Sequence, residues 1–153
     1  MVLIDDVESF DAERRSLSAV VRITPASPFF VRGEGAARGG VPSWAAIEYM
    51  AQTSAALTGR LELVVSPDAQ PRPGFLLGTR RLVLDLERFE DGESYHVRAV
   101  MVYSDGATAA FDCTITDGSG RVVASASLNA FRPPDDLLAS LSKEQGTRHQ
   151  DKS

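Results

Sequence analysis

The sequence predicts an α+β protein in which one long helix is wrapped by a curved antiparallel sheet. Three Asp-Gly pairs, at 91–92, 105–106 and 117–118, divide the second half of the chain. An Asp-Gly pair between apolar stretches is a strong signal for a tight turn joining antiparallel strands. Residues 43–58 are instead rich in alanine and apolar nearly all round, which is typical of a buried helix. In a small protein, a curved sheet is the element able to bury such a helix.

The first elements along the chain are predicted to form a hairpin. Its strands are LIDDV (3–7) and SLSAVVRIT (16–24), and the polar residues 11–15 connect them. Residues 24–42 are rich in proline and glycine, so we expect an irregular connection there.

The helix is predicted over residues 43–58, about 16 residues and roughly 24 Å long. Ser43 follows Pro42 and suits either the N-cap or the first turn, and Gly59 suits the position just past the C-terminus. An antiparallel meander should follow, with strands at about 75–89, 94–103, 107–116 and 121–131.

Residues 1–131 are therefore expected to form a single domain, followed by a polar tail at 132–153. The tail contains Pro133-Pro134 and then mostly polar residues. We expect it to be mobile, apart from a short turn around Leu137 to Leu141.

Composition narrows the classes of function. The 153 residues are 43% hydrophobic and 24% charged, with a net charge of −5, which argues against general nucleic-acid binding. No apolar run is long enough to span a membrane, and the acidic N-terminus makes the cytoplasm the expected location. The single cysteine, Cys113, lies in an apolar run and is expected to be a buried, inert thiol. The fold requires no metal, and we expect none.

One carboxylate, Glu48, lies alone in the otherwise uncharged segment 41–59. Its neighbours at helical spacing are all uncharged, so the side chain risks burial without a cation from its own helix. A carboxylate whose pKa is raised in an apolar crevice suits general acid or base catalysis. The alternative is that Glu48 faces water at a gap in the sheet or pairs with one of four arginines: Arg32, Arg38, Arg80 or Arg81.

The segment PSWAAIEYMAQ (42–52) resembles the central-helix motif P-G-x-x-x-I-E-x-M-A-Q of the hot-dog 3-hydroxyacyl-[acyl-carrier-protein] dehydratases. LIDDV (3–7), PFF (28–30), GFLLG (74–78) and the Asp91-Gly92 turn resemble other parts of that family. In detail, VPSWAAIEYMAQ followed by GFLLGTRR is most similar to the ApeP-type subgroup of aryl-polyene biosynthesis. The resemblance covers residues 1–131 and implies a hot-dog fold.

The resemblance also implies roles for individual residues. Glu48 matches the catalytic acid/base, the N–H of Ser43 would polarise the thioester carbonyl, and Gln52 would orient Glu48 or the preceding loop, or simply be a satisfied amide. Two further sets are expected, an acyl-binding surface at Trp44, Tyr49, Phe75, Leu77 and Gly78, and a carrier-binding rim that includes Arg80 and Arg81, for which scattered solvated arginines are the alternative.

The sequence departs from the family pattern at its histidine. The family has a catalytic His just before the helix, and VRGEGAARGGVP (31–42) contains none. Of the two histidines present, His149 lies in the polar tail, and alternation in SYHVRAV places His96 on the exposed face of a strand. Related chains also carry P-H-R-x-P-M before the first strand, so the true start, and a histidine with it, could lie upstream.

Three functions are compatible with the sequence. The first is a dehydratase, or dehydratase subunit, acting on 3-hydroxyacyl groups held on the phosphopantetheine of acyl-carrier protein or coenzyme A, with no other cofactor. The second is a hot-dog thioesterase that needs no histidine. The third is a non-catalytic subunit that completes a second hot-dog protein. Each is expected as a homodimer or heterodimer, because a monomer would leave a sheet edge unpaired.

Overall fold

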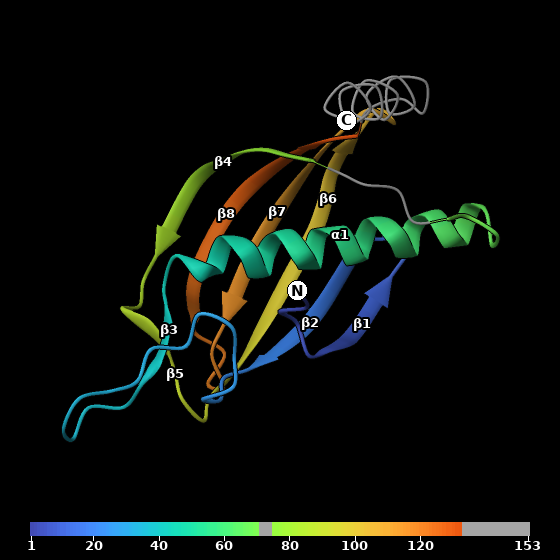
Figure 1. The fold of residues 1–153 in the computed structure, drawn as a ribbon. Helices are drawn as coiled ribbons and strands as arrows, with labels where there is room; N and C mark the ends of the chain where they lie inside the picture. The colour runs from blue at the N-terminus through green and yellow to red at the C-terminus, as the bar shows by residue number, and fades with distance from the viewer. Residues whose placement is uncertain (71–74, 133–153) are drawn as a thin grey trace, which may run out of the picture.

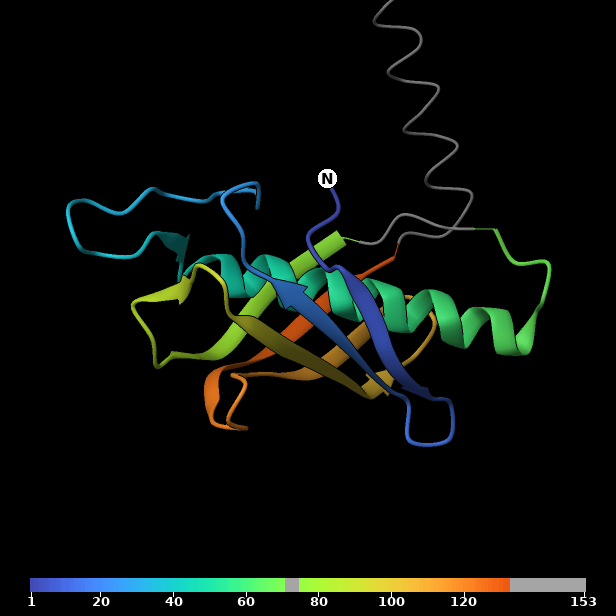
Figure 2. The ribbon, with the colours of Figure 1, turned by 90° about the horizontal axis from the view of Figure 1, so that it is seen from below.

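A computed structural model describes residues 1–70 and 75–132, without the side chains of 75–77. Within these ranges, a single helix lies along one face of a curved antiparallel sheet (Figures 1 and 2). In chain order, the elements are β1 (Asp6–Asp11), β2 (Ser16–Arg22), β3 (Gly40–Pro42), α1 (Ala45–Val65), β4 (Phe75–Leu84), β5 (Arg88–Glu90), β6 (Ser94–Ser104), β7 (Thr108–Thr116) and β8 (Val122–Phe131).

The six strands of the main sheet lie in the order β1-β2-β6-β7-β8-β4, and every neighbouring pair is antiparallel. β1 and β4 are therefore the two edges. The predicted tight turns join β5 to β6, β6 to β7 and β7 to β8, and their left-handed residues are Gly92, Gly106 and Gly120. At the third turn the positive φ falls on Gly120, two residues after the predicted Asp117-Gly118 pair.

The core lies between α1 and the inner face of the sheet. The helix buries seven residues: Ala45, Ala46, Tyr49, Met50, Thr53, Ser54 and Leu57. On β6, Tyr95, Val97 and Ala99 are buried, and the residues between them face outward. This alternation confirms the period-2 pattern expected of a half-buried strand.

The helix is longer than predicted, because it continues through Gly59 to Val65. A Cβ at Gly59 would meet no described atom within 4 Å, so nothing there forces the chain to turn. Good helix formers follow in RLEL (60–63), and a helical glycine costs only about 1 kcal/mol. The predicted stop at Gly59 is wrong, and the last turns of the helix carry exposed Leu63, Val64 and Val65.

Two predicted strands also differ from the structure. The stretch 75–89 is divided, because β4 ends at Leu84 and the chain re-enters as β5, which pairs with β3 in a small separate sheet. At the break, the N–H of Asp85 still bonds the carbonyl of Val123 at 2.8 Å. The first strand is β1 at 6–11 rather than 3–7, because its partner residues on β2 lie opposite Asp6–Asp11.

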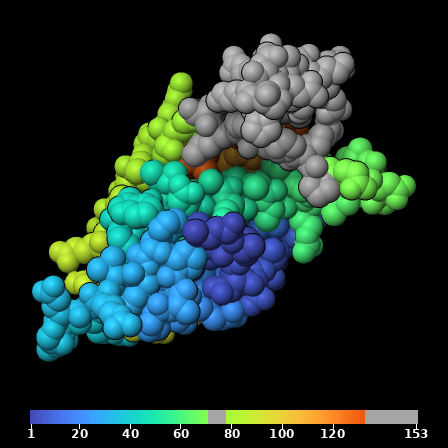
Figure 3. Space-filling view, viewed as in Figure 1, coloured from blue at the N-terminus to red at the C-terminus, as the bar shows by residue number. Residues whose placement is uncertain are grey.

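The connection at 24–42 is irregular, as expected, apart from β3 and an isolated bridge between Val31 and Gly40. Residues 31–38 are exposed and project from the body as an arm (Figures 1, 2 and 3). In the described part of the chain, no helix is long and apolar enough to cross a membrane.

Candidate functional site at the start of the helix

The small β3–β5 sheet fixes the place where α1 begins. Val41 lies opposite Phe89, and both side chains are fully buried. Phe89 packs edge-on between two tyrosine rings, with centroids 5.3 Å from Tyr49 and 4.8 Å from Tyr95. A Cβ at Gly40 would lie 2.3 Å from the carbonyl oxygen of Phe89, so only glycine allows this close approach. The start of the helix thus packs on the buried residues of the β3–β5 sheet, which we call the β3–β5 platform.

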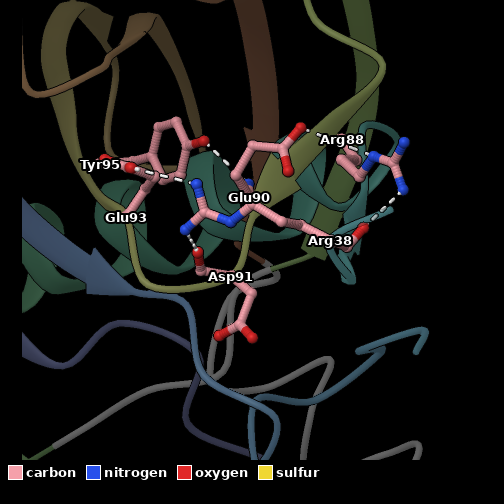
Figure 4. Close-up of polar contacts among 6 residues, drawn as sticks. All are labelled: Arg38, Arg88, Glu90, Asp91, Glu93 and Tyr95. Atoms are coloured by element: carbon pink, nitrogen blue, oxygen red, sulfur yellow. Dashed lines mark hydrogen bonds and ion pairs between the residues drawn. The ribbon is translucent and has the colours of Figure 1, made fainter. Parts of the chain in front are cut away.

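Polar contacts hold the connection just before β3 against the same platform (Figure 4). The Arg38 guanidinium donates a hydrogen bond to the carbonyl oxygen of Asp91 and lies 3.7 Å from a carboxylate oxygen of Glu93. Arg88 donates to the carbonyl oxygen of Arg38 at 2.9 Å and pairs with Glu90 at 3.6 Å. Three of these contacts tie Arg38, at the base of the arm, to β5 and its turn, and the fourth lies within β5.

Ser43 precedes the helix but does not cap it. The N-cap position belongs to Trp44, which has helical dihedrals and makes no side-chain cap bond. Of the two positions expected for Ser43, the N-cap is therefore wrong and the first turn remains. The carbonyl of Ser43 accepts the N–H of Ala46 at 3.0 Å, which places Ser43 in a first, tight turn. Among the described residues, none accepts the backbone N–H of Ser43. This donor therefore has no described protein partner and lies next to the positive end of the helix dipole.

Glu48 lies one turn into α1 and is exposed. In the single chain, Glu48 does not lie in the apolar crevice that was one of the two expectations. The other expectation, a carboxylate that faces water, agrees with its exposure. None of the described arginines pairs with it, and Arg38 is used by Asp91 and Glu93. One turn before Glu48, Trp44 is 51% exposed, and its ring lies 5.0 Å from that of Phe29. Glu48 thus shares an open surface with an aromatic pair.

Phe29 has an unusual backbone conformation. Its φ is 68°, in the left-handed region that a bulky side chain rarely adopts. Strain of this kind persists only where the surroundings fix it and often marks a functional surface. Here the left-handed backbone of Phe29 places its ring against that of Trp44, and both rings remain partly exposed to water.

Gln52 binds the N-terminal segment. Its Oε1 accepts the N–H of Leu3 at 2.7 Å, and its Nε2 donates to the carbonyl oxygen of Met1 at 2.6 Å. No hydrogen bond links it to Glu48 within the described residues. Of the roles considered for Gln52, that of a satisfied amide fits the geometry, with the backbone of residues 1–3 as its partner.

Tyr49 is a core residue, so the expectation that it lines an acyl site is wrong for the single chain. Its ring is 2% exposed and packs against Phe89. Burial raises the pKa of the Tyr49 hydroxyl to about 12, and the charge of Asp5 adds to the effect. The helical period explains the difference, because residue 49 lies on the inner face of α1 and residue 48 on the outer face.

The remaining predicted site residues lie on β4, the edge strand that follows the helix. Phe75 and Leu77 belong to β4, and their side chains lie outside the described part of the structure. Gly78 lies at a register shift against β8, and Arg80 and Arg81 are exposed at a second irregularity, where Arg81 has a φ of 52°. β4 ends on the side of the sheet where α1 begins (Figure 1).

The described histidine, His96, does not lie beside Glu48. His96 lies on the outer face of β6, where its Nδ1 is 2.9 Å from a carboxylate oxygen of Glu8. The sheet separates it from α1, which confirms the predicted exposed position. His149 lies outside the described residues. Within the described ranges, no three residues among His, Cys, Asp and Glu gather in a way that could hold a metal ion.

A cavity of about 1120 Å³ lies beside the C-terminal half of α1. It was not predicted from the sequence. Ala51, Ala55 and Gly59 form its helix side, and Met101, Phe111 and Leu128 lie on its sheet side. The repeat of small residues at every fourth helix position is the sequence signal that could have indicated it. We call this cavity the distal cleft.

Known proteins of similar fold agree with this architecture. The dehydratase heterocomplex ApeI:P from Xenorhabdus doucetiae matches with a TM-score of 0.78 and 24% identity, over 92% of this chain and 88% of that one. A hypothetical thioesterase from Streptococcus pneumoniae, solved with coenzyme A, matches with a TM-score of 0.61 and 14% identity over 84% of each chain. The PaaI protein of E. coli matches with a TM-score of 0.60 and 12% identity, over 84% and 79%.

Comparison with curated proteins finds no match. The sequence profile of the ApeP-like family, described as ApeP dehydratase, matches residues 1–142. A profile match over most of the chain, the IEYMAQ helix and the helix-in-sheet architecture support one conclusion: this chain is a hot-dog protein of the ApeP-like dehydratase family.

Proposed function

We propose that the protein is a dehydratase subunit that acts on 3-hydroxyacyl thioesters and shares its active site with a second hot-dog subunit. The observation that carries the proposal is the position of Glu48. The carboxylate lies on an open surface at the start of the helix, and the one described histidine lies on the opposite face of the sheet. Because no histidine of the described ranges reaches this site, we propose that its histidine comes from another chain.

The surface around Glu48 suits such a partner. Trp44 and Phe29 form an aromatic pair that a monomer leaves partly in water. β4 is an edge strand that exposes Leu82 and Val83, the latter by 55%. Exposed apolar side chains next to an unpaired edge are typical of an interface. The neighbour from Xenorhabdus doucetiae is described as a heterocomplex, which favours a different hot-dog chain over a second copy.

The proposed chemistry removes a proton from C2 and the hydroxyl from C3 of the acyl group, leaving a trans-2-enoyl thioester and water. Glu48 would make one of the two proton transfers and a partner histidine the other. The free N–H of Ser43, at the positive end of the helix, would donate to the thioester carbonyl as the C2 proton leaves. Arg80 and Arg81 would attract the phosphopantetheine or the acidic carrier protein.

The test begins with affinity purification of the tagged chain from its native host and identification of any second hot-dog chain that accompanies it. Enoyl absorbance is then followed with a 3-hydroxyacyl-pantetheine thioester, for the chain alone and for the complex. Glu48→Gln should lower enoyl formation by about 10²–10⁴-fold, and Glu13→Gln, in the exposed β1–β2 turn, is the matched control. Unchanged activity in Glu48→Gln would exclude the catalytic role. A homodimer that is fully active alone would exclude the need for a different partner chain.

A thioesterase is the second candidate, because the carboxylate of Glu48 faces water without a histidine beside it. In that reaction Glu48 would activate water for attack on the thioester carbonyl, and free thiol would be released. Following thiol and enoyl together in the same assay separates the two functions. Thiol release without enoyl, lost in Glu48→Gln, would replace the dehydratase proposal.

A further inference from the structure

The interior of the distal cleft offers a ligand apolar contacts and few hydrogen bonds. Its sheet side carries the buried side chains of Phe111 and Leu128. Two helix hydroxyls line the other side, and both are engaged: that of Ser54 lies 3.4 Å from the Sγ of Cys113, and that of Thr58 donates to the carbonyl of Ser54 at 2.9 Å. An occupant therefore gains by burying apolar groups there and loses by burying polar ones.

The margin of the cleft carries a cation that no described carboxylate pairs with. The guanidinium of Arg15 lies 3.0 Å from the Sδ of Met101, and a thioether sulfur is only a weak acceptor. The backbone of the same two residues is also joined, because the N–H of Met101 donates to the carbonyl of Arg15 at 2.9 Å. Arg15 is thus fixed at the margin, and a guanidinium binds a carboxylate through two parallel hydrogen bonds.

The other two charges of the cleft neutralise each other. The guanidinium of Arg132 pairs with the carboxylate of Glu62 on the helix, and both side chains are mostly buried. Among the described residues that line the cleft, Arg15 is therefore the one uncompensated charge. A ligand with a single negative charge matches it, whereas a phosphate group, with a charge of about −2, would lack a second cation there.

The length of the cleft suits a hydrocarbon chain. Its helix side runs from Ala51 to Val65, which at 1.5 Å per residue is roughly 21 Å. An extended hydrocarbon gains about 1.3 Å per carbon, the projection of a C–C bond of about 1.5 Å, so dodecanoate, about 14 Å long, is accommodated. Ala55 and Gly59 on this side are exposed, which leaves the cleft open to an entering ligand.

We propose that the distal cleft binds the anion of a long-chain fatty acid, with the chain against Phe111 and Leu128 and the carboxylate on Arg15. Glu48 does not line this cleft, so the site is distinct from the one at the start of the helix. The inference is independent of the proposed reaction. Hydrolysis of a long-chain acyl thioester is the class of reaction that would supply such a ligand.

The first test is equilibrium dialysis of the full chain against radiolabelled dodecanoate and, separately, dodecanol, each kept below the concentration at which it self-associates. One dodecanoate per chain is expected. Arg15→Gln should weaken the binding of dodecanoate by about 10–100-fold and leave that of dodecanol nearly unchanged. Arg14→Gln, an exposed neighbour in the same turn, is the matched control and should bind both as the parent does.

Three results of this test would overturn the proposal. The parent chain could bind no dodecanoate, which would mean that something else fills the cleft. It could bind many molecules per chain, which would indicate adsorption to the surface. Arg15→Gln could bind dodecanoate as tightly as Arg14→Gln, which would show that Arg15 does not hold the carboxylate.

The second test locates the hydrocarbon chain. Ala51→Phe and Ala55→Phe, made singly, place a ring in the cleft and should each weaken the binding of both probes, with circular dichroism as the check on folding. Ala36→Phe, on the exposed arm, is the control for added bulk. Glu48→Gln should bind dodecanoate as the parent does. Binding that is lost in Glu48→Gln and kept in both cleft variants would assign the ligand to the start of the helix and overturn the proposal.

Discussion

Gly40→Ala tests whether the β3–β5 platform sets the position of the helix start. A Cβ at residue 40 would lie 2.3 Å from the carbonyl oxygen of Phe89 and 3.1 Å from the Cδ of Arg88. The first contact is with backbone, which cannot rotate away. The pairing between Gly40 and Glu90 would therefore have to open, and the movement would pass through Val41 to Ser43.

The magnitude follows from the size of the overlap. An ordinary Cβ contact lies at 3.4–4 Å, so the strands must separate by more than 1 Å. Overpacking of this kind typically costs about 1–3 kcal/mol, and in a protein of this size 1 kcal/mol lowers the Tm by about 2–4 °C. We expect a loss of roughly 3–10 °C. Because the N–H of Ser43 would also move, dehydration should fall by more than the unfolded fraction accounts for.

Thermal unfolding followed by circular dichroism measures the first effect, and enoyl formation well below the Tm measures the second. Gly118→Ala is the matched control, because a Cβ there meets nothing within 4 Å and its φ is not positive. A Gly40→Ala protein with the stability and activity of this control would refute the reasoning that the platform positions the site.

Two further predictions concern side chains whose surroundings the structure defines. Gln52→Ala removes two hydrogen bonds to the backbone of residues 1 and 3, each worth about 0.5–1.5 kcal/mol, so the Tm should fall by roughly 3–10 °C. An unchanged Tm would mean that the amide does not hold this segment. Burial raises the pKa of the Cys113 thiol to about 11, so at pH 8 the native protein should react with a disulfide reagent more than about 100-fold more slowly than the unfolded chain. Equal rates would contradict its burial.

The elements defined by local chemistry could be predicted from the sequence. The Asp-Gly turns, the alternation of β6 and the alanine-rich helix all depend on neighbours within a few residues, and the structure contains each of them. Boundaries that depend on distant partners could not be predicted. Nothing local to 85–87 shows that the chain leaves the main sheet so that β5 can pair with β3, nearly fifty residues earlier.

In the candidate site, too, local features could be predicted from the sequence and features that depend on distant partners could not. The type and spacing of Glu48 within its motif were visible in the sequence, and so was the outward face of His96. The exposure of Glu48 was not, because it depends on which helix face the sheet covers. The partner of Gln52 could not be predicted either, since the backbone of residues 1–3 reaches it only through the fold.

An exposed carboxylate is a poor catalyst, because water competes for its hydrogen bonds and screens its charge. If the partner subunit supplies the histidine, it must also exclude water from Glu48, and Trp44 on the same surface would be buried with it. Trp44 is the only tryptophan of the chain and is 51% exposed, so it reports on this surface alone.

Complex formation should therefore shift the Trp44 emission to shorter wavelength and protect it from iodide quenching. The partner's own tryptophans are first replaced by phenylalanine, and Trp44→Phe, which should lose the signal, is the control. The shift should follow the gain of enoyl-forming activity as the partner is titrated. A complex that is active while Trp44 stays as quenchable as in the isolated chain would show that the site lies elsewhere.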